Sequence, residues 1–255
     1  MQQLTIVKIG GKIVENPELL SPFLKDFTLI AGDKILVHGG GHSATELAEK
    51  LGITTTMTEG RRITDEKMLK VVTMVYAGLI NKTVTAQLQK LRMDAIGLTG
   101  ADMNLILSEK RPVKEIDYGF VGDIKEINAR GFLELLKQNY LPVIAPITHD
   151  GAGNLLNTNA DTIAAEIAKA LAFDFNVRLI YCFEKKGVLM NEADEESLIS
   201  TLDFESFQQY KDKGIIHGGM IPKLTNAFQA IVSGVKEVII TCTSDLNTGK
   251  GTLIR

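Results

Sequence analysis

Apolar runs rich in β-branched residues recur along this chain, and most are separated by segments with the 3.6-residue spacing of amphipathic helices. The runs are Leu4–Ile9, Lys34–His38, Asp94–Leu98, Leu141–Ala145, Val177–Phe183 and Glu237–Thr241. Strands that alternate with helices predict a mainly parallel sheet with helices on both faces, and ligands then bind at the carboxyl ends of the strands. We therefore expect an α/β fold, a three-layer αβα sandwich with an open sheet.

Two other segments have distinct patterns. Residues 65–91 carry the longest helical signal, with Met68, Val71, Val72, Val75 and Leu79 at helical spacing, and a helix packed on the core is its simplest interpretation. Tyr118–Ile127 alternates polar and apolar residues, which predicts an antiparallel strand, in a hairpin with Asn104–Ser108. Such a hairpin would form a lid or flap.

The pattern also predicts two lobes. After a helix over Ala160–Leu171 the sequence restarts with the strand Val177–Phe183. We expect residues 1–171 to form a lobe that binds the acylated substrate and mediates dimerisation, and residues 172–255 to form a nucleotide-binding lobe. The motifs described below give the reason for both assignments.

Composition narrows the class of protein. A chain of 255 residues with 45% hydrophobic content can bury a large core, and its formal net charge of −3 argues against a nucleic-acid partner. Cys182 and Cys242 each lie in an apolar run, as buried thiols do in a reducing cytosol. The N-terminus has no basic, apolar leader and no stretch reaches about 18 apolar residues, so we expect a cytoplasmic protein without a membrane partner.

Glycines and lysines gather where apolar runs end. The elements are Lys8-Ile9-Gly10-Gly11, His38-Gly39-Gly40-Gly41, Gly97-Leu98-Thr99-Gly100 and Gly218-Gly219-Met220-Ile221-Pro222-Lys223. Glycine lets backbone N–H groups approach an anion, a helix start adds its positive dipole end, and the lysines add full charges. Neither lysine lies in a P-loop frame. The pattern predicts a phosphate-binding pocket, and phosphoryl transfer is the chemistry that needs one most.

A competing interpretation is a dinucleotide-binding fingerprint. Gly39, Gly41 and Ala44 satisfy G-x-G-x-x-G/A after a strand, and Glu59 follows about twenty residues later. A dehydrogenase would leave the element at Lys8 unexplained. It would also need Glu59 to end a strand, whereas Glu59 leads directly into Gly60.

Other polar residues also have more than one interpretation. Asn157, Asn159 and Asp161 precede a helix, where such residues usually act as N-caps, although this many exceed what capping needs and could face a carboxylate or amide. Arg62 precedes a helix start and suits bidentate carboxylate binding, yet adjacent arginines are more often solvated. The four histidines lack the spacing of a zinc site.

Taken together, these elements resemble the amino acid kinase family, and within it the branch that phosphorylates N-acetyl-L-glutamate, over essentially the whole chain. The motifs are Lys8–Gly11, Val37–Gly41, Gly60–Thr64, Val75–Lys82, Gly119–Gly122, Pro142–Pro146, Asn157–Asp161 and Gly218–Lys223. The resemblance implies ATP-dependent phosphorylation of the side-chain carboxylate of N-acetyl-L-glutamate, which yields an acyl phosphate in arginine biosynthesis.

Site residues follow from the resemblance by position. It implies that Lys8 and Lys223 hold the transferring phosphoryl group and that Asp161 orients both lysines. The resemblance further implies that the other site residues bind substrate groups through backbone N–H groups or polar side chains: Gly10, Gly11 and Gly219 the phosphates, Gly40 and Gly41 the reacting carboxylate, Arg62 and Asn157 the α-carboxylate, and Asn159 the neutral acyl amide. Mg²⁺ would arrive bound to ATP, and no metal-ligating residue of the protein is expected.

The chain departs from the family pattern in three places. His42 replaces a proline after the glycines, Cys182–Val188 replaces a Thr-Asp before a Gly-Val step, and Cys242–Asp245 replaces an Asp-Gly-Arg. Contacts to the adenine and ribose are therefore not carried over from the family.

The resemblance also bears on assembly and on the acyl group. We expect a homodimer through residues 65–91, and no arginine-inhibited hexamer, because the first strand begins by Leu4 and leaves no room for the extra N-terminal helix of hexameric relatives. A succinyl group is the alternative to acetyl. Its second carboxylate would need a positive partner, for which Arg61, Lys125 and Arg130 are the candidates. A sensor without turnover would be favoured if the lysines or Asp161 were missing.

Overall fold

The structure is a computed structural model that describes residues 1–58 and 60–255. Glu59, which the dinucleotide fingerprint would require, lies outside the described residues. None of the helices in the described part of the chain is both long enough and apolar enough to cross a membrane.

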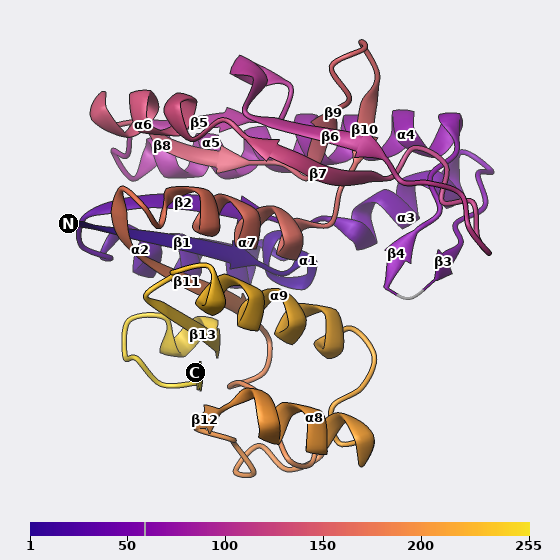
Figure 1. The fold of residues 1–255 in the computed structure, drawn as a ribbon. Coiled ribbons are helices and arrows are strands. Elements are labelled where there is room, and N and C mark those ends of the chain that lie inside the picture. Colours follow the sequence, from indigo (N-terminus) through magenta and orange to yellow (C-terminus); the bar gives the residue numbers. More distant parts are fainter. Residues whose placement is uncertain (59) are drawn as a thin grey trace.

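An eight-stranded sheet crosses the molecule in the order β12-β14-β13-β11-β1-β2-β8-β5 (Figure 1). Its strands are β1 (Gln2–Ile9), β2 (Asp33–His38), β5 (Ala95–Leu98), β8 (Leu141–Ile144), β11 (Phe175–Phe183), β12 (Thr201–Leu202), β13 (Glu237–Cys242) and β14 (Thr252–Ile254). Each of the predicted apolar runs forms one of these strands, and only β13 and β14 pair antiparallel. The mainly parallel sheet is confirmed.

Helices cover both faces of the sheet, as the alternation predicted. The α-helices are α1 (Gly11–Val14), α2 (Pro17–Thr28), α3 (Gly41–Lys50), α4 (Glu66–Val72), α5 (Asn81–Lys90), α6 (Ala129–Lys137), α7 (Ala160–Leu171), α8 (Phe204–Asp212) and α9 (Met220–Val232). Leu4 and Ile6 of β1 pack with residues of α6, α7 and α9, whereas Val7 and Ile9 pack with residues of α2, α4 and α5. In Figure 1, α7 and α9 lie in front of the sheet and α2 lies behind it. The three-layer αβα sandwich is confirmed.

A second sheet, in the order β10-β9-β6-β7, stands beside the first. It comprises β6 (Ile106–Lys110), β7 (Gly122–Ile127), β9 (Ile147–His149) and β10 (Leu155–Asn157), and a two-stranded ribbon joins β3 (Met57–Thr58) to β4 (Arg61–Arg62). The predicted hairpin is confirmed, because β6 and β7 pair antiparallel. The strand is shorter than predicted, since Gly119 and Val121 make only isolated bridges to Thr64 and Asn157.

The helix predicted over residues 65–91 is not continuous. Asp65 caps α4, its Oδ1 accepting from the Met68 N–H at 2.7 Å, but Thr73–Ile80 form a π-helix, η1, before α5 resumes. A π-helix has i→i+5 hydrogen bonds, so side chains beyond it no longer follow the 3.6-residue period. Met68, Val71, Val72 and Val75 are buried as predicted, whereas Leu79 is 64% exposed, and its assignment to the core was wrong.

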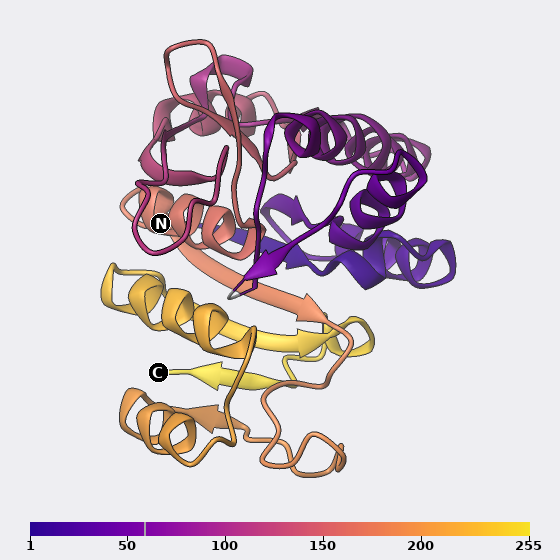
Figure 2. The same cartoon turned by 90° about the vertical axis from the view of Figure 1, so that its right-hand side faces the viewer.

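The C-terminal elements extend the same sheet. Every residue of β1 pairs with β11, and Figure 2 shows the orange and yellow elements of the C-terminal part below β11. The predicted helix over residues 160–171 is α7. The division into lobes at residues 171 and 172 stays a prediction.

Candidate active site

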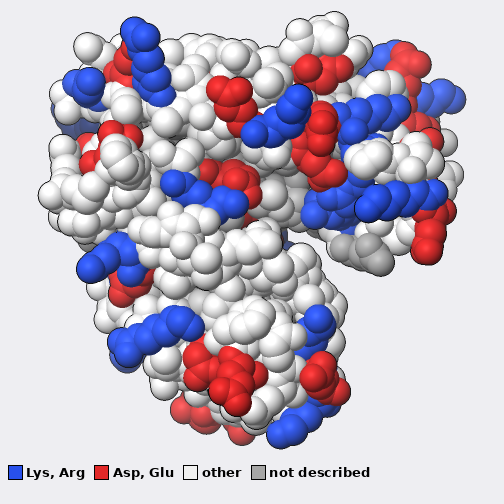
Figure 3. Space-filling model, in the orientation of Figure 1, with Lys and Arg blue, Asp and Glu red and all other residues white. Residues whose placement is uncertain are grey.

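A cavity of about 230 Å³ lies at the carboxyl ends of β1 and β2. It is lined by Lys8, Gly11, Gly39, Gly40, Gly41, Met57, Gly60, Arg61, Arg62, Tyr76, Val121, Pro146, Asn157, Thr158, Asn159, Ala160 and Asp161. In Figure 3 the surface is hollowed between the part that carries α3 and β4 and the part that carries α9, and charges of both signs surround the hollow. Most of the predicted site residues therefore gather in one place, as the rule for parallel sheets requires.

Two lysines share the carboxylate of Asp161, which lines this cavity together with Lys8. Lys8, in β1, places its Nζ 2.7 Å from Oδ1 of Asp161, which lies in the first turn of α7. Lys223, in the first turn of α9, approaches the other oxygen, Oδ2, at 3.1 Å. All three side chains are at least four-fifths buried. Three elements far apart in sequence thus hold two positive charges side by side.

Burial and charge act in opposite directions on this cluster. Burial alone would raise the pKa of Asp161, but the charges of Lys8 and Lys223 and their hydrogen bonds outweigh it and hold the pKa well below its usual range. Burial lowers the pKa of Lys223, and the nearby Asp161 partly opposes that change. Two ammonium groups around one carboxylate place an excess of positive charge at this point, which suits the cluster to a phosphoryl group.

The glycine turns present backbone N–H groups to the same space. An ideal Cβ on Gly11 would lie 3.5 Å from the nitrogens of both Gly40 and Gly41, so the two turns meet. Gly40 has φ +155°, and a Cβ there would lie 2.3 Å from Ile80 Cδ1, which only glycine avoids. Gly10 differs from prediction, because its N–H donates to the Cys182 carbonyl at 3.1 Å. This hydrogen bond extends the pairing of β1 with β11, and it leaves the Gly10 N–H unable to donate to a phosphate.

Arg62 is buried beside the glycine turn and is not solvated. Its Nη2 donates to the Gly41 carbonyl at 2.7 Å and to Thr45 Oγ1 at 2.9 Å, and its Nη1 donates to Thr55 Oγ1 at 3.3 Å. These bonds fix the guanidinium in the wall of the cavity. Arg61, one of the candidate partners for a second carboxylate, also lines the cavity.

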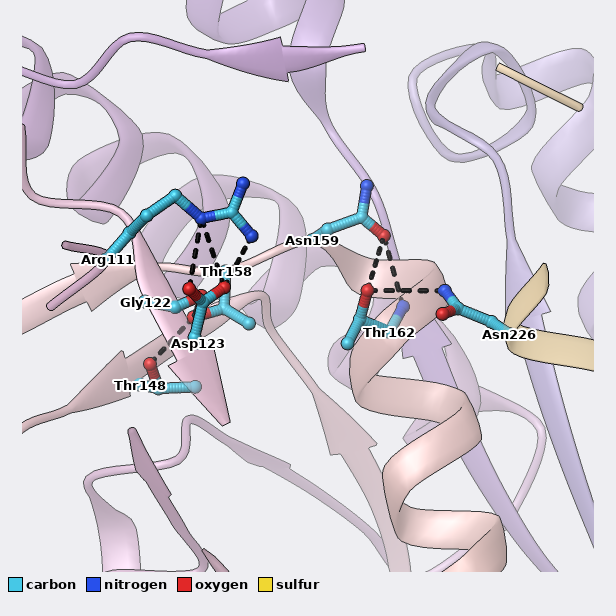
Figure 4. Close-up of polar contacts among 8 residues, drawn as sticks. All are labelled: Arg111, Gly122, Asp123, Thr148, Thr158, Asn159, Thr162 and Asn226. Atoms are coloured by element: carbon cyan, nitrogen blue, oxygen red, sulfur yellow. Dashed lines mark hydrogen bonds and ion pairs between the residues drawn. The ribbon is translucent and has the colours of Figure 1, made fainter. Parts of the chain in front are cut away.

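Asn157 and Asn159 line the cavity from the segment that leads into α7. Asn157 Nδ2 donates to Thr64 Oγ1 at 3.0 Å, while Asn159 caps α7, its Oδ1 accepting from the Thr162 N–H at 3.1 Å. Figure 4 shows the Asn159 amide nitrogen turned away from Thr162. Capping therefore uses only the oxygen of Asn159, and the amide nitrogen can also face a ligand.

Of the predicted site residues, Gly10 and Lys223 do not line this cavity, and neither does Gly219. Gly219 is the N-cap residue of α9. Its neighbour Met220 lines a second, smaller pocket together with Phe183, Val188, Leu189 and His217. This pocket lies at the carboxyl end of β11, where the chain departs from the family pattern. Beside it, Lys12 forms an ion pair with Glu184 at 2.7 Å.

Two supporting residues of the glycine turn were not predicted. His38 is fully buried, with Nδ1 2.8 Å from the Gly39 carbonyl and Nε2 3.1 Å from Nδ2 of Asn81. Burial lowers the pKa of His38 to about 4, so the ring is neutral and donates from Nδ1. Ser43, at the start of α3, donates its N–H to Glu15 at 2.6 Å. The sequence places His38 in the glycine element His38–Gly41 but does not indicate this supporting contact, and it gives no signal for Ser43.

A resident metal does not fit the donors of this site. Among the described residues, no three His, Cys, Asp or Glu side chains are grouped to hold an ion. Both oxygens of Asp161 are occupied by lysine ammonium groups, and Glu184 is paired with Lys12. A divalent ion at this site would therefore take its ligands mainly from bound phosphate and from water.

Comparisons with known proteins agree with this geometry. The profile of the amino acid kinase family matches residues 3–242. The chain is 60% identical to the acetylglutamate kinases of Azobacteroides pseudotrichonymphae and Parabacteroides distasonis, with complete coverage of both chains in each case. The crystal structure of smu.665 from Streptococcus mutans is 27% identical, with 98% of each chain covered and a TM-score of 0.82. The chain belongs to the amino acid kinase family.

Proposed function

We propose that this protein transfers the γ-phosphoryl group of ATP to the side-chain carboxylate of N-acetyl-L-glutamate, a step of arginine biosynthesis. The observation that carries the proposal is the pair of lysines on Asp161 beside the glycine turns, in a chain with full-length acetylglutamate kinase relatives. The family match explains the glycine turn without a dinucleotide, which leaves the dehydrogenase interpretation without support. We place the enzyme in the cytoplasm, where its two buried free thiols would stay reduced.

The reaction brings together two groups of like charge. A carboxylate oxygen of the substrate attacks the γ-phosphorus, and the bond from that phosphorus to the bridging oxygen of ADP breaks. Each pair of unit charges at roughly 4 Å repels by about 4 kcal/mol at an effective dielectric near 20. Lys8, Lys223 and the N–H groups of Gly11, Gly40 and Gly41 would offset this repulsion. A carboxylate carries no proton, so positioning and charge neutralisation suffice without a general base.

Substrate and nucleotide would enter from different sides. Arg62 and Asn157 would bind the α-carboxylate, and Asn159 the acyl amide. Lys223 lies in the first turn of α9, and Met220, the first residue of that helix, lines the second pocket with Val188 and Leu189, so we assign this pocket to the nucleotide. Gly219 would then contact phosphate from the nucleotide side. Mg²⁺ on the β- and γ-phosphates would supply further charge neutralisation.

A coupled assay of ADP release tests the proposal. The purified protein should release ADP only when both ATP and an N-acylglutamate are present, and hydroxylamine should trap the acyl phosphate as a hydroxamate. ADP release that is independent of the acyl amino acid would contradict the proposal. So would tight binding of ATP and acetylglutamate without any turnover, which would indicate a sensor.

Selectivity for the acyl group can be measured side by side. We expect kcat/KM for N-acetyl-L-glutamate to exceed that for the succinyl analogue by at least about tenfold, because a buried, unpaired second carboxylate is costly. Of the candidate partners for that carboxylate, Arg130 is solvent-exposed and paired with Glu134, whereas Arg61 lines the cavity.

The opposite preference would identify a succinylglutamate kinase. In that case Arg61→Ala should abolish the preference. Lys125→Ala and Arg130→Ala serve as matched controls and should leave it unchanged, since neither side chain lines the cavity.

We propose a homodimer formed through η1 and its flanking helices. Met74 and Leu79 of η1 are 53% and 64% exposed, which is unusual for apolar side chains so close together and typical of an interface between two copies. Light scattering should give a dimer, and Leu79→Glu should give a monomer. Leu51→Glu, at an equally exposed leucine at the end of α3, should stay dimeric. A hexamer, or inhibition by submillimolar arginine, would contradict this assembly.

A further inference from the structure

Tyr76 lies at the meeting point of the π-helix and the cavity. It is in the middle of η1, is only 6% exposed, and lines the same cavity as Lys8 and Arg62. π-Helical turns are rare and are frequent at functional sites, because the widened turn redirects a side chain that an α-helix would place elsewhere. The described site gives this tyrosine no role so far.

The hydroxyl of Tyr76 is held in its protonated form next to a positive charge. Burial raises its pKa, and the charge and hydrogen bonding of Arg62 lower it in part, so that the net change is upward. The geometry agrees, because Tyr76 and Arg62 line the same cavity and contact the adjacent glycines Gly40 and Gly41. A phenol that stays protonated at neutral pH can donate a hydrogen bond to an anion.

Both side chains are held in place before any ligand binds. The Tyr76 ring packs on the glycine turn, since an ideal Cβ on Gly40 would lie 3.0 Å from its Cδ1 and 3.3 Å from its Cε1. Arg62 is fixed by its bonds to Gly41, Thr45 and Thr55. A rigid pair of donors costs little conformational entropy on binding and recognises a group of matching geometry.

We propose that the Tyr76 hydroxyl, together with Arg62, binds the α-carboxylate of the acyl amino acid. This inference rests on the proposed function and adds a specificity-determining residue to it. The phenol supplies a hydrogen bond without a second positive charge, so the α-carboxylate is held beside Arg62 and does not compete with the γ-phosphate for Lys8. A substrate analogue of the same length that lacks the α-carboxylate would leave the Tyr76 and Arg62 donors unpaired.

Tyr76→Phe removes the hydroxyl and keeps the ring on Gly40. We expect the KM for N-acetyl-L-glutamate to rise by about tenfold, the loss typical of one hydrogen bond to a charged group, while kcat and the KM for ATP change by less than about twofold. Tyr140→Phe is the matched control and should behave as wild type, because Tyr140 directly precedes β8, at the amino ends of the parallel strands, and does not line the cavity.

A substrate analogue separates recognition from a merely structural role. N-acetyl-4-aminobutyrate lacks the α-carboxylate, so its inhibition constant should be the same for wild type and Tyr76→Phe. An unchanged KM for acetylglutamate in Tyr76→Phe would overturn the inference, and so would an equal loss of affinity for both compounds. Wild-type protein that fails to phosphorylate acetylglutamate would instead overturn the proposed function, and the inference with it.

Discussion

Lys8→Ala and Lys223→Ala should each lower kcat by at least about a hundredfold, with a smaller effect on the KM for acetylglutamate. Both ammonium groups are buried and fixed by Asp161, so they are already in place where negative charge concentrates during transfer. A donor held in this way stabilises the transition state without reorganisation when the reaction occurs. Steady-state kinetics with both substrates varied provide the measurement.

Two further variants test whether the lysines and Arg62 have separate roles. Arg62→Ala should mainly raise the KM for the acyl amino acid, because Arg62 is anchored in the cavity wall away from the lysine cluster. Lys169→Ala is the control for removal of a partly buried lysine, since Lys169 pairs with Glu166 on α7 outside the cavity. Similar small effects from Lys8, Lys223 and Arg62 would contradict this division of labour.

Asp161→Asn should lower kcat by about a hundredfold and shift the alkaline limb of its pH profile towards neutrality. The carboxylate orients both lysines and raises the pKa of Lys223, which burial and Lys8 lower. Without that carboxylate the pKa of Lys223 falls further. Lys223 then loses its proton at a lower pH, and the rate is lost with it.

The same substitution should change how stability depends on pH. The pKa of Asp161 is lower in the folded protein than its ordinary value of 3.8, so the stabilisation it provides is present above that value and is lost as the pH falls towards the depressed pKa. Asp161→Asn should lack this acid dependence and lose about 3 kcal/mol at neutral pH. Denaturant titrations across the acid range measure both effects. Glu166→Gln is the control on the same helix, and equal acid sensitivity of wild type and Asp161→Asn would count against the ion-pair cluster.

The structure differs most from the sequence-based prediction around η1. The apolar spacing of residues 65–91 predicted a helix and a buried face, and Met68 to Val75 follow it. Spacing could not reveal the π-helix of Thr73–Ile80, because an apolar period near 3.6 residues does not distinguish i→i+4 from i→i+5 hydrogen bonds over so short a segment. The exposure of Leu79 and the entry of Tyr76 into the cavity both follow from that local geometry.

The glycine turns show that the sequence also cannot tell which single backbone N–H groups are free to donate. Sequence identified Gly10, Gly11, Gly40 and Gly41 as a set, since each follows a strand and any of them can bring its backbone close to an anion. Only the pairing of β1 with β11 shows that the Gly10 N–H is used by Cys182. A hydrogen-bond donor is available or occupied according to its neighbours in space, which the order of residues does not record.

The sequence alone determined the strands of the central sheet, the layered fold and the residue types of the site, because period, apolar runs and glycine positions are local properties of the chain. It also predicted that the glycine and lysine elements form one phosphate-binding pocket, since carboxyl ends of parallel strands meet at one edge, and the family resemblance added Asp161 as the partner of Lys8 and Lys223. The tertiary structure alone decided that one carboxylate holds both lysines, that Arg62 is buried and anchored, and that Tyr76 faces the cavity. These are contacts between segments distant in sequence, so their distances and burial exist only after the layers have packed.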